Sequence, residues 1–299
     1  MKYIVTGGAG FIGSHVVDHL INQGNEVKVI DNLSSGSELN INPKAEFAKH
    51  DLSDNELSLS DIIKGFDGVF HLAALPSIQP SFNQPMEHHK NNIDSILNLL
   101  MAMRDAGIPR IVISSSSSCY GNAESYPTDE TEKISLENPY ALQKYSAEQY
   151  GLIFGKFWGI QVISLRYFNV YGPRSFNPED RFNSYSSVIG IFNYKHKNNE
   201  KIEVTGDGNQ QRDFVHAFDV ARANELAMNS KVDGDFFNVG FGKAYSINEV
   251  ANIFSDQVEH IPERTGEAHI TLADVAKIKK SLGWEPTISL EKALKEDLL

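Results

Sequence analysis

Cysteine, long apolar runs and positive charge are all scarce in this sequence. Cys119 is the one cysteine among 299 residues, which excludes an intrachain disulfide and a cysteine-based zinc site. Every apolar run falls short of the ~18 residues that a membrane-spanning helix needs, so we predict no membrane partner. With 27 Lys and Arg against 39 Asp and Glu, the net charge is −12. That charge repels a polyphosphate backbone and argues against a nucleic-acid partner, although a small anionic ligand needs only a few local N–H groups and cations.

The remaining composition is that of an ordinary globular protein. Apolar residues make up 41% and charged residues 22%, which excludes a disordered or collagen-like chain. The length fits one large domain or two modest ones. The chain passes from Met1-Lys2 directly into the β-rich segment Tyr3–Thr6, which is typical of a buried strand and not of a signal peptide. We therefore expect a cytoplasmic protein.

Short β-rich segments alternate with amphipathic stretches through the first half of the chain. Strands are predicted over 3–6, 26–30, 68–72, 110–114 and 161–165, and helices over 14–23, 92–107, 218–228, 247–254 and 274–282. This alternation predicts right-handed crossovers and a doubly wound parallel sheet, an α/β fold of the Rossmann type. We divide the chain into a first lobe, 1–170, and a smaller α/β lobe, 171–299, that is interleaved with it. The polar segment 176–183 is expected to be a loop.

A glycine-rich turn stands where the first predicted strand gives way to the first predicted helix. Residues 6–13 read TGGAGFIG, with glycines at Gly7, Gly10 and Gly13. They permit a tight turn, a close approach of the backbone to a pyrophosphate, and close packing of the helix on the sheet. A pyrophosphate would face the start of the helix, at Phe11 and Ile12, where free N–H groups favour negative charge. The alternative is a turn that only shapes the chain.

Acidic residues follow two of the early strands. Asp31 ends the second predicted strand, where its carboxylate would accept hydrogen bonds from an adenosine ribose and repel a 2′-phosphate. This favours NAD over NADP as the cofactor. Asp51-Leu52 also follows a strand and either borders the adenine or is a simple loop acid.

A tyrosine and a lysine four residues apart suggest acid–base chemistry. Asn138 can cap a helix that begins with Pro139, and Tyr140 and Lys144 then share one face of it. We expect a lysine ammonium held near the tyrosine and a nicotinamide to lower the pKa of the phenol and make it a base near neutral pH. Ser116 would supply a hydroxyl to the same reacting oxygen. The alternative is an unrelated pair on the surface of a helix.

Several motifs in order resemble the extended short-chain dehydrogenase/reductases, and most closely the nucleotide-sugar epimerases of the UDP-glucose 4-epimerase type. They are TGGAGFIGSH, HLAA, SSSSSCYG, YALQK, RYFNVYGPR and GDGNQQRDFVHAFDVA, and together they span nearly the whole chain. The resemblance implies that residues 1–170 bind NAD and that residues 171–299 bind a nucleotide sugar. It also implies a homodimer, formed through the helices at 92–107 and 140–154.

The family's catalytic triad falls on Ser116, Tyr140 and Lys144. Ser114 and Ser115 are alternatives for the hydroxyl, but Ser116 keeps the family's spacing to Tyr120-Gly121. The positions that match the family's cofactor contacts are Gly7, Gly10, Phe11, Ile12, Gly13, Asp31, Asn32, Asp51, Leu52, Ala73, Ala74, Asn91, Tyr140, Lys144 and Tyr167.

The resemblance covers several reactions that begin with oxidation at C4 of the sugar. Dehydratases of the family carry Asp-Glu after the catalytic hydroxyl and sugar-acid decarboxylases carry Glu, whereas this chain has Ser117 and Ser118 there. A 4-keto sugar without those carboxylates is expected to be reduced again on either face, which is 4-epimerisation with NAD regenerated. The rival interpretations are another enzyme of the same scaffold, a reductase, dehydratase or other epimerase acting on a dTDP- or GDP-sugar, and a non-catalytic dinucleotide sensor.

Five residues of the second half match the family's substrate contacts. Arg212 and Arg264 would bind the diphosphate and nucleoside through their planar guanidinium groups. Glu267 would accept from a ribose hydroxyl and Asn169 would donate to a phosphate. Thr271 stands where a bulky aromatic residue restricts the sugar pocket in the family, so UDP-GlcNAc and UDP-GalNAc are expected beside UDP-Glc and UDP-Gal.

No metal site is predicted. His15 and His19 have a ligand-like spacing of four, but no Glu lies between them as in a zinc protease. We interpret both as histidines on the surface of a helix.

Overall fold

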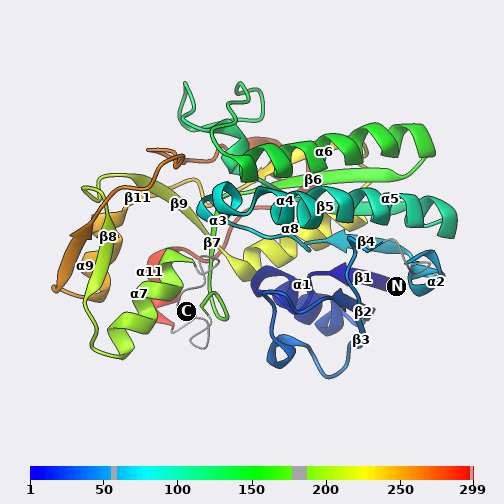
Figure 1. Cartoon of the computed structure of the whole chain (residues 1–299), viewed down its shortest axis with the longest axis horizontal. Coiled ribbons are helices and arrows are strands. Elements are labelled where there is room, and N and C mark those ends of the chain that lie inside the picture. Colours follow the sequence, from blue (N-terminus) through cyan, green and yellow to red (C-terminus); the bar gives the residue numbers. More distant parts are fainter. Residues whose placement is uncertain (55–58, 177–186, 297–298) are drawn as a thin grey trace.

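The larger lobe is built on a parallel sheet. In the computed structural model, which describes residues 1–54, 59–176, 187–296 and 299, seven strands lie in the order β10–β6–β5–β4–β1–β2–β3 (Figure 1). In that order they span Asp235–Val239, Gln161–Tyr167, Arg110–Ser116, Gly68–His71, Lys2–Thr6, Glu26–Asp31 and Glu46–Lys49. All neighbouring strands run parallel, so their carboxyl ends share one edge of the sheet. The predicted doubly wound parallel sheet is confirmed.

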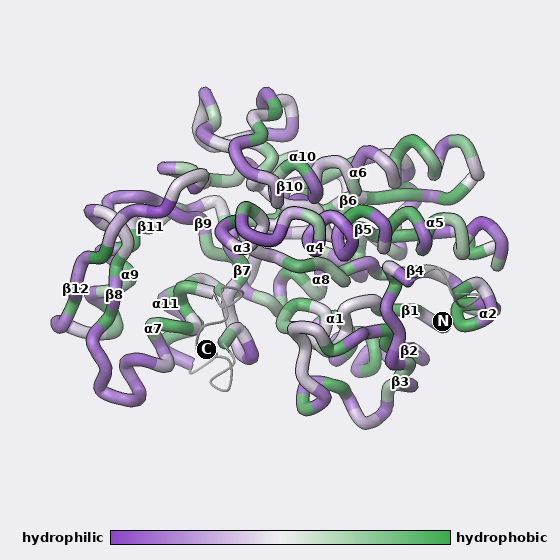
Figure 2. Tube along the Cα trace, viewed as in Figure 1, coloured by the Kyte–Doolittle hydropathy of each residue, from purple (hydrophilic) through white to green (hydrophobic). Residues whose placement is uncertain are grey.

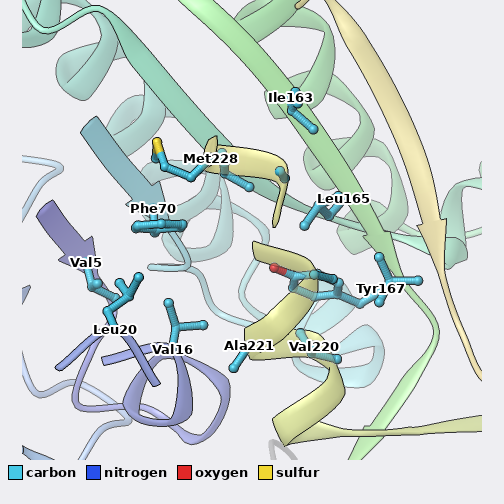
Figure 3. Packing of buried hydrophobic residues seen from close by; sticks show 14 of the residues in the cluster. Val5, Val16, Leu20, Phe70, Ile163, Leu165, Tyr167, Val220, Ala221 and Met228 are labelled. Carbon is cyan, nitrogen blue, oxygen red and sulfur yellow. The ribbon is translucent and has the colours of Figure 1, made fainter. Parts of the chain in front are cut away.

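Helices cover both faces of this sheet. One face packs on α1 (Phe11–Asn22) and α8 (Ala217–Asn229), and the other on α2 (Leu59–Ile63), α5 (Ser95–Ala106) and α6 (Pro139–Trp158). Adjacent residues of β1 show the division, because Val5 packs with the α1–α8 cluster and Ile4 with the α5–α6 cluster. Figure 3 shows Val5 beside Val16 and Leu20 of α1. Apolar residues at successive positions of the strand are what a parallel sheet buried on both faces requires.

The smaller lobe contains two short sheets with their own apolar core. One sheet has the order β11–β9–β7, the other pairs β12 with β8, and α7, α9 and α11 pack around them. These elements span Asn169–Tyr171 (β7), Val188–Lys197 (α7), Ile202–Thr205 (β8), Gln211–His216 (β9), Ala244–Ser246 (β11), Ile247–Phe254 (α9), Val258–Ile261 (β12) and Leu290–Lys295 (α11). Figure 1 shows this lobe beside the carboxyl edge of the large sheet.

Short elements complete the described chain. They are 3-10 turns at Glu38–Asn40 (η1) and Ser117–Tyr120 (η3), a π-helical turn at Lys90–Asp94 (η2), and α3 (Ile78–Asn83), α4 (Pro85–His89) and α10 (Ala276–Leu282). Hydrophobic stretches run along β6 and α5, whereas the turn between α7 and β8 is hydrophilic (Figure 2). No helix in the described part of the chain is both long and apolar enough to cross a bilayer.

The predicted strands of the larger lobe agree with the structure, whereas the strands of the smaller lobe were not predicted. The five predicted strands match β1, β2, β4, β5 and β6 within two residues at their ends. β3 was expected only as the strand before Asp51, without bounds, and β10 and the short strands β7, β8, β9, β11 and β12 were not predicted. β10 pairs with β6, and α8 packs on α1, so two elements beyond residue 170 belong to the larger lobe. The division at residue 170 stays a prediction. The loop predicted over 176–183 lies outside the described residues, apart from Phe176.

Candidate active site

The glycine-rich turn forms an open cradle between β1 and α1. Gly7 has φ +69°, and the Gly10 N–H donates to the Gly7 carbonyl at 3.1 Å. A Cβ on Gly13 would lie 2.1 Å from the Gly7 carbonyl oxygen, so only glycine fits there. Gly10 caps α1 without a side-chain hydrogen bond. The N–H groups of the first turn, at Phe11 and Ile12, are therefore not capped by a side chain, as an anionic ligand requires.

Asp31 lies beside this cradle at the end of β2. Its carboxylate accepts from the Ala9 N–H at 3.0 Å and the Leu33 N–H at 2.8 Å. Burial raises the pKa of Asp31, while the two N–H groups act in the opposite direction. A helix N-terminus with an acid at the neighbouring strand end fits the pyrophosphate and ribose of a dinucleotide. NAD would be held here, and its contacts to individual residues stay predictions.

One large cleft joins the cradle to the smaller lobe. It has a volume of about 1280 Å³, more than the several hundred Å³ typical of a pocket for one small ligand. Every residue predicted to contact cofactor or substrate lines it: Gly7, Gly10, Phe11, Ile12, Gly13, Asp31, Asn32, Asp51, Leu52, Ala73, Ala74, Asn91, Ser116, Tyr140, Lys144, Tyr167, Asn169, Arg212, Arg264, Glu267 and Thr271. The fold thus brings together residues that the sequence spreads over 265 positions.

Three residues on the cofactor side have polar groups that are already hydrogen-bonded within the protein. Asn32 Nδ2 donates to Asp51 Oδ2 at 3.2 Å, and Asp51 also accepts from the N–H and the hydroxyl of Ser53. Asp51 is thus held as part of a structured turn, which fits either of its two predicted interpretations. Asn91 Nδ2 donates to the Glu87 carbonyl at 2.9 Å, within the helical segment that precedes α5.

Tyr140, Lys144 and Ser116 meet at the centre of the cleft. Asn138 caps α6 by accepting the Ala141 N–H at 2.8 Å, so the helix begins at Pro139, one residue before Tyr140. Ser116 ends β5, and its hydroxyl hydrogen-bonds the Tyr140 phenol. Among the alternatives, Ser114 accepts from Lys144 Nζ at 3.2 Å, and Ser115 Oγ is buried with no partner in the described residues. The contact with the phenol favours Ser116 as the catalytic hydroxyl.

Burial and hydrogen bonding are the main influences on the pKa values of Tyr140 and Lys144 in this arrangement, and the expected effect of Lys144 on the phenol beside a nicotinamide stays a prediction. Burial raises the pKa of Tyr140, and the hydrogen bond with Ser116 is what opposes the rise. Burial also lowers the pKa of Lys144 to about 8, although the carboxylate of Glu148 opposes it. The physical reason is that the phenol and the ammonium both lie out of water, and Lys144 Nζ donates to Ser114.

At the other end of the cleft, Arg212 and Glu267 form an ion pair. Arg212 Nη2 lies 3.4 Å from Glu267 Oε2, and Nη1 donates to the carbonyls of Gln211 and His269. Burial lowers the pKa of Arg212, and Glu267 opposes that shift. Glu267 is thus close to the guanidinium that is predicted to hold the diphosphate. Arg264 lines the same end of the cleft.

Asn169 lines the cleft and donates both amide hydrogens within the protein. Its Nδ2 donates to Thr271 Oγ1 at 2.9 Å and to the Asp213 carbonyl at 3.1 Å. Donation to a phosphate would exchange one of these bonds, and the predicted role stays a prediction. In the structure Asn169 holds Thr271 in place, together with the Asp213 N–H, which donates to the same hydroxyl at 3.2 Å.

Tyr167 lines the cleft, but its side chain lies on the α8 face of the large sheet. Its ring packs in the core beside Leu165, Val220 and Ala221 (Figure 3), and its hydroxyl is hydrogen-bonded to the Asn224 carboxamide. A contact of Tyr167 with the cofactor stays a prediction, and with the ring packed in this way it would be made by the backbone at the strand end. The strand alternates its side chains between the two faces of the sheet, and position 167 falls on the α8 face.

The histidine prediction needs correction. His15 is buried and lies against the Pro173 carbonyl at 2.8 Å, instead of on the surface. Burial lowers the pKa of His15 to about 4. His19 pairs with Glu225 at 2.6 Å. No group of three potential metal ligands occurs among the described residues.

Two cations that the sequence interpretation missed also line the cleft. Arg174 forms an ion pair with Asp18 at 2.8 Å, and Lys195 with Glu203 at 2.6 Å. Arg174 ends the RYFNVYGPR motif, so its position was visible in the sequence although its role was not. Lys195 lies in a polar helical segment without a distinguishing pattern.

Comparisons with known proteins place this arrangement in a family. A family model described as the NAD dependent epimerase/dehydratase family matches residues 3–240. The chain is 39% identical, over 98% of its length and 95% of the relative's, to a putative UDP-glucose 4-epimerase of Methanocaldococcus jannaschii. A UDP-glucose 4-epimerase of Thermotoga maritima, solved with UDP-glucose, superimposes with a TM-score of 0.93 at 39% identity and covers 99% of this chain and 96% of its own. A UDP-N-acetylglucosamine 4-epimerase of Methanobrevibacter ruminantium, solved with UDP-N-acetylmuramic acid, gives 0.88 at 38% identity, with 99% and 95% covered. This chain belongs to the NAD-dependent epimerase/dehydratase family.

Proposed function

We propose that the protein catalyses the reversible C4 epimerisation of a UDP-hexose, with NAD as a cofactor that is regenerated in each cycle. The observation that carries the proposal is the meeting of Ser116, Tyr140 and Lys144 in one cleft, between the glycine cradle and the Arg212–Glu267 pair. The UDP-glucose 4-epimerases that resemble the chain over nearly its full length support the same reaction.

Each residue of the triad has its own role in the transfer of the C4 hydroxyl proton. When bound, NAD accepts a hydride from C4 of the sugar and returns it. Tyr140, as phenolate, takes the proton of the C4 hydroxyl and gives it back when the 4-keto sugar is reduced. The Ser116 hydroxyl orients the C4 oxygen and, through its bond to the phenol, favours the deprotonated form. Lys144 is charged below its pKa of about 8 and places a positive charge one helical turn from Tyr140.

The residues after the catalytic hydroxyl favour epimerisation over dehydration. Ser117 and Ser118 form the turn η3 and line the cleft at the place where dehydratases of the family carry Asp and Glu. A serine hydroxyl is a poor base for removing a proton from carbon. The 4-keto sugar is therefore left to be reduced again, on either face once it has rotated in the cleft.

The direct test is conversion of the substrate. The purified protein is incubated with UDP-glucose, with and without added NAD, and the products are separated by anion exchange and identified by proton NMR. We expect the 4-epimer, and we expect Y140F to lose nearly all turnover. Y126F is the control, because Tyr126 is 38% exposed and is not among the residues that line the cleft. Absence of conversion even with NAD would overturn the proposal and favour another nucleotide sugar or a reductase.

We further propose that the sugar pocket accepts a 2-acetamido group. Thr271 is small, and its hydroxyl is turned to Asn169 and the Asp213 N–H. The similarity to a UDP-N-acetylglucosamine 4-epimerase supports this reading. T271Y is expected to suppress conversion of UDP-GlcNAc while UDP-glucose is still converted. Equal losses for both sugars would contradict the assignment of Thr271 to the C2 side.

The proposed assembly is a homodimer formed through α5 and α6. The outer surface of these helices exposes Met101, Tyr150, Ile153 and Phe157, with Ile153 61% and Phe157 80% accessible. Exposed apolar side chains on two neighbouring helices are typical of a protein interface. Light scattering after size exclusion should give the mass of a dimer, and F157E should give a monomer. A wild-type monomer would contradict the proposal.

We also propose that the protein works in the cytoplasm. Its single thiol, Cys119, is fully buried and free, so the described fold uses no disulfide and suits a reducing compartment. Cell fractionation with an antibody would test the location, and recovery outside the cytoplasm would contradict it.

A further inference from the structure

The loop that carries two of the predicted nucleotide contacts is attached to both lobes. Arg264 and Glu267 lie between β12 and the described bridge of Gln211 with Ile270. On the side of the smaller lobe, the Gln211 N–H donates to the His269 carbonyl at 2.8 Å, and Arg212 donates to the same carbonyl at 3.3 Å. These bonds fix the end of the loop to β9.

The tip of the loop is held by the larger lobe. Gln79 Nε2, on α3, donates to the Thr265 carbonyl at 2.8 Å, and Asn138 Nδ2 donates to the Gly266 carbonyl at 3.0 Å. The side-chain carboxamides of Gln79 and Asn138 thus donate hydrogen bonds to two adjacent backbone carbonyls of the loop. Gly266 has φ +82°, and a Cβ there would meet the Phe82 ring at 3.2 Å, so the tip also packs closely on α3.

Asn138 forms hydrogen bonds through both the oxygen and the nitrogen of its carboxamide. Its Oδ1 accepts the Ala141 N–H at 2.8 Å and so caps α6, while its Nδ2 holds Gly266. The side chain is 7% exposed, which keeps water from competing for either bond. The Tyr140 N–H is fixed close by, because it donates to Ser81 Oγ at 3.2 Å. One small group therefore joins the start of the catalytic helix to the nucleotide-binding loop.

We propose that Asn138 is a positioning residue. It fixes the position of the loop bearing Arg264 and Glu267 relative to Tyr140, and Gln79 is its partner in holding the tip of the loop. The inference rests on the proposed function, because the loop matters to the reaction through the nucleotide that it holds. A loop that is already ordered binds its ligand without the entropic cost of ordering it. Loss of the bond to Gly266 should therefore weaken nucleotide binding more than it slows the chemical step.

Serine at position 138 separates the two uses of the asparagine. Ser caps a helix about as well as Asn, but its short hydroxyl cannot reach Gly266. We expect N138S to keep the melting temperature of the wild type, while the KM for UDP-glucose and the Kd for UDP rise about 2- to 10-fold, the range of one neutral hydrogen bond. The kcat should change less than about twofold. N138A loses the cap as well and should also melt at a lower temperature.

The matched control removes a similar bond far from the cleft. Asn25 Nδ2 donates to the Leu20 carbonyl at 3.0 Å at the end of α1. N25S is expected to leave KM, Kd and kcat unchanged. If N138S fails to fold, Q79A frees the neighbouring carbonyl of Thr265 without touching α6 and should raise the Kd for UDP in the same way.

Amide hydrogen exchange tests the inference without a measurement of turnover. Peptides that cover 262–270 should exchange faster in N138S than in the wild type, while peptides of α6 exchange equally. Faster exchange with an unchanged Kd for UDP, or a fall in melting temperature with no change in KM, would overturn the inference and leave Asn138 as a cap. If the wild type binds UDP but does not convert UDP-glucose, the proposed function fails, and the shift in Kd still decides the role of Asn138.

Discussion

The buried ion pair between Glu148 of α6 and Arg166 of β6 allows a direct test of what fixes the catalytic helix to the large sheet. Glu148 is fully buried and Arg166 is 2% exposed. The guanidinium donates to the two carboxylate oxygens at 2.6 and 3.0 Å, and Ser164 Oγ donates at 3.1 Å. Arg166 also donates to the Tyr120 hydroxyl at 2.8 Å and lies 4.0 Å from the centre of the Phe236 ring. Removing the carboxylate would leave a cation in the core without its counter-charge.

We expect E148A to lower the free energy of unfolding by about 3–5 kcal/mol, the cost of breaking a buried pair from one side. The loss is larger than the net value of the bonds, because Arg166 would stay charged and out of water. E148L/R166M should recover most of it, since it removes both desolvation penalties and fills the space with apolar side chains. E26A is the control, because Glu26 pairs with Lys2 on the surface, and it should cost less than about 1 kcal/mol.

Urea unfolding followed by circular dichroism measures these differences at one pH and salt concentration. The double-mutant cycle of the two positions gives the coupling between them. The reasoning is refuted if E148A unfolds within about 1 kcal/mol of the wild type. It is also refuted if E148L/R166M is no more stable than E148A, because the cost would then lie in packing and not in the unpaired charge.

Three further predictions concern the glycine cradle, Asp31 and Lys144. G13A places a Cβ 2.1 Å from the Gly7 carbonyl oxygen, so the Kd for NAD measured by fluorescence should rise about 10- to 100-fold; an unchanged Kd would show that the turn can relax. D31N removes the charge opposite the ribose, so NAD should bind about tenfold more weakly and NADP should lose less; equal losses would contradict the role of Asp31. Lys144 has a pKa of about 8 in the folded state and 10.5 as an ordinary lysine, so the unfolded state binds more protons between these two pH values. The free energy of unfolding should therefore rise by about 3 kcal/mol as the pH increases from 8 to 10.5. K144M should lack this rise in urea unfolding at pH 7.5–10.5, and identical slopes for the two proteins would refute the assigned pKa.

The parts of the site that could be predicted from sequence are those fixed by local structure. A glycine turn between a strand and a helix determines where the first helix begins, and the four-residue spacing of Tyr140 and Lys144 determines a shared face once Asn138 caps the helix. Parallel strands then bring Asp31 and Ser116 to one edge of the sheet. Each of these steps depends on neighbours in the chain or on the direction of a strand.

The parts that could not be predicted depend on contacts between distant segments. The amide of Asn169 donates to Thr271, 102 positions later, a contact that no local pattern indicates. The ring of Tyr167 turns to the core because Asn224 of α8 binds its hydroxyl there. The direction in which the pKa of Tyr140 is shifted in this structure could not be predicted for a related reason, since spacing on a helix says nothing about how far burial removes both groups from water.

The exchange of segments between the lobes joins the two sides of the cleft. This explains how a cleft this large can hold one sugar carbon at the reacting groups. β6 ends at Tyr167, and β7 of the smaller lobe begins at Asn169, so the two lobes are joined by a single residue at this point. That residue, Phe168, donates its N–H to the Val239 carbonyl at the end of β10, at 3.0 Å. The residue at which the chain passes into the smaller lobe is therefore fixed to the end of the neighbouring strand of the large sheet, and the ends of β6 and β10 form one hydrogen-bonded frame at this edge. The loop bearing Arg264 lies outside that frame and is attached to the larger lobe by single hydrogen bonds, among them the one from Asn138 to Gly266. N138S should therefore loosen the loop and leave the strand that carries Ser116 in place.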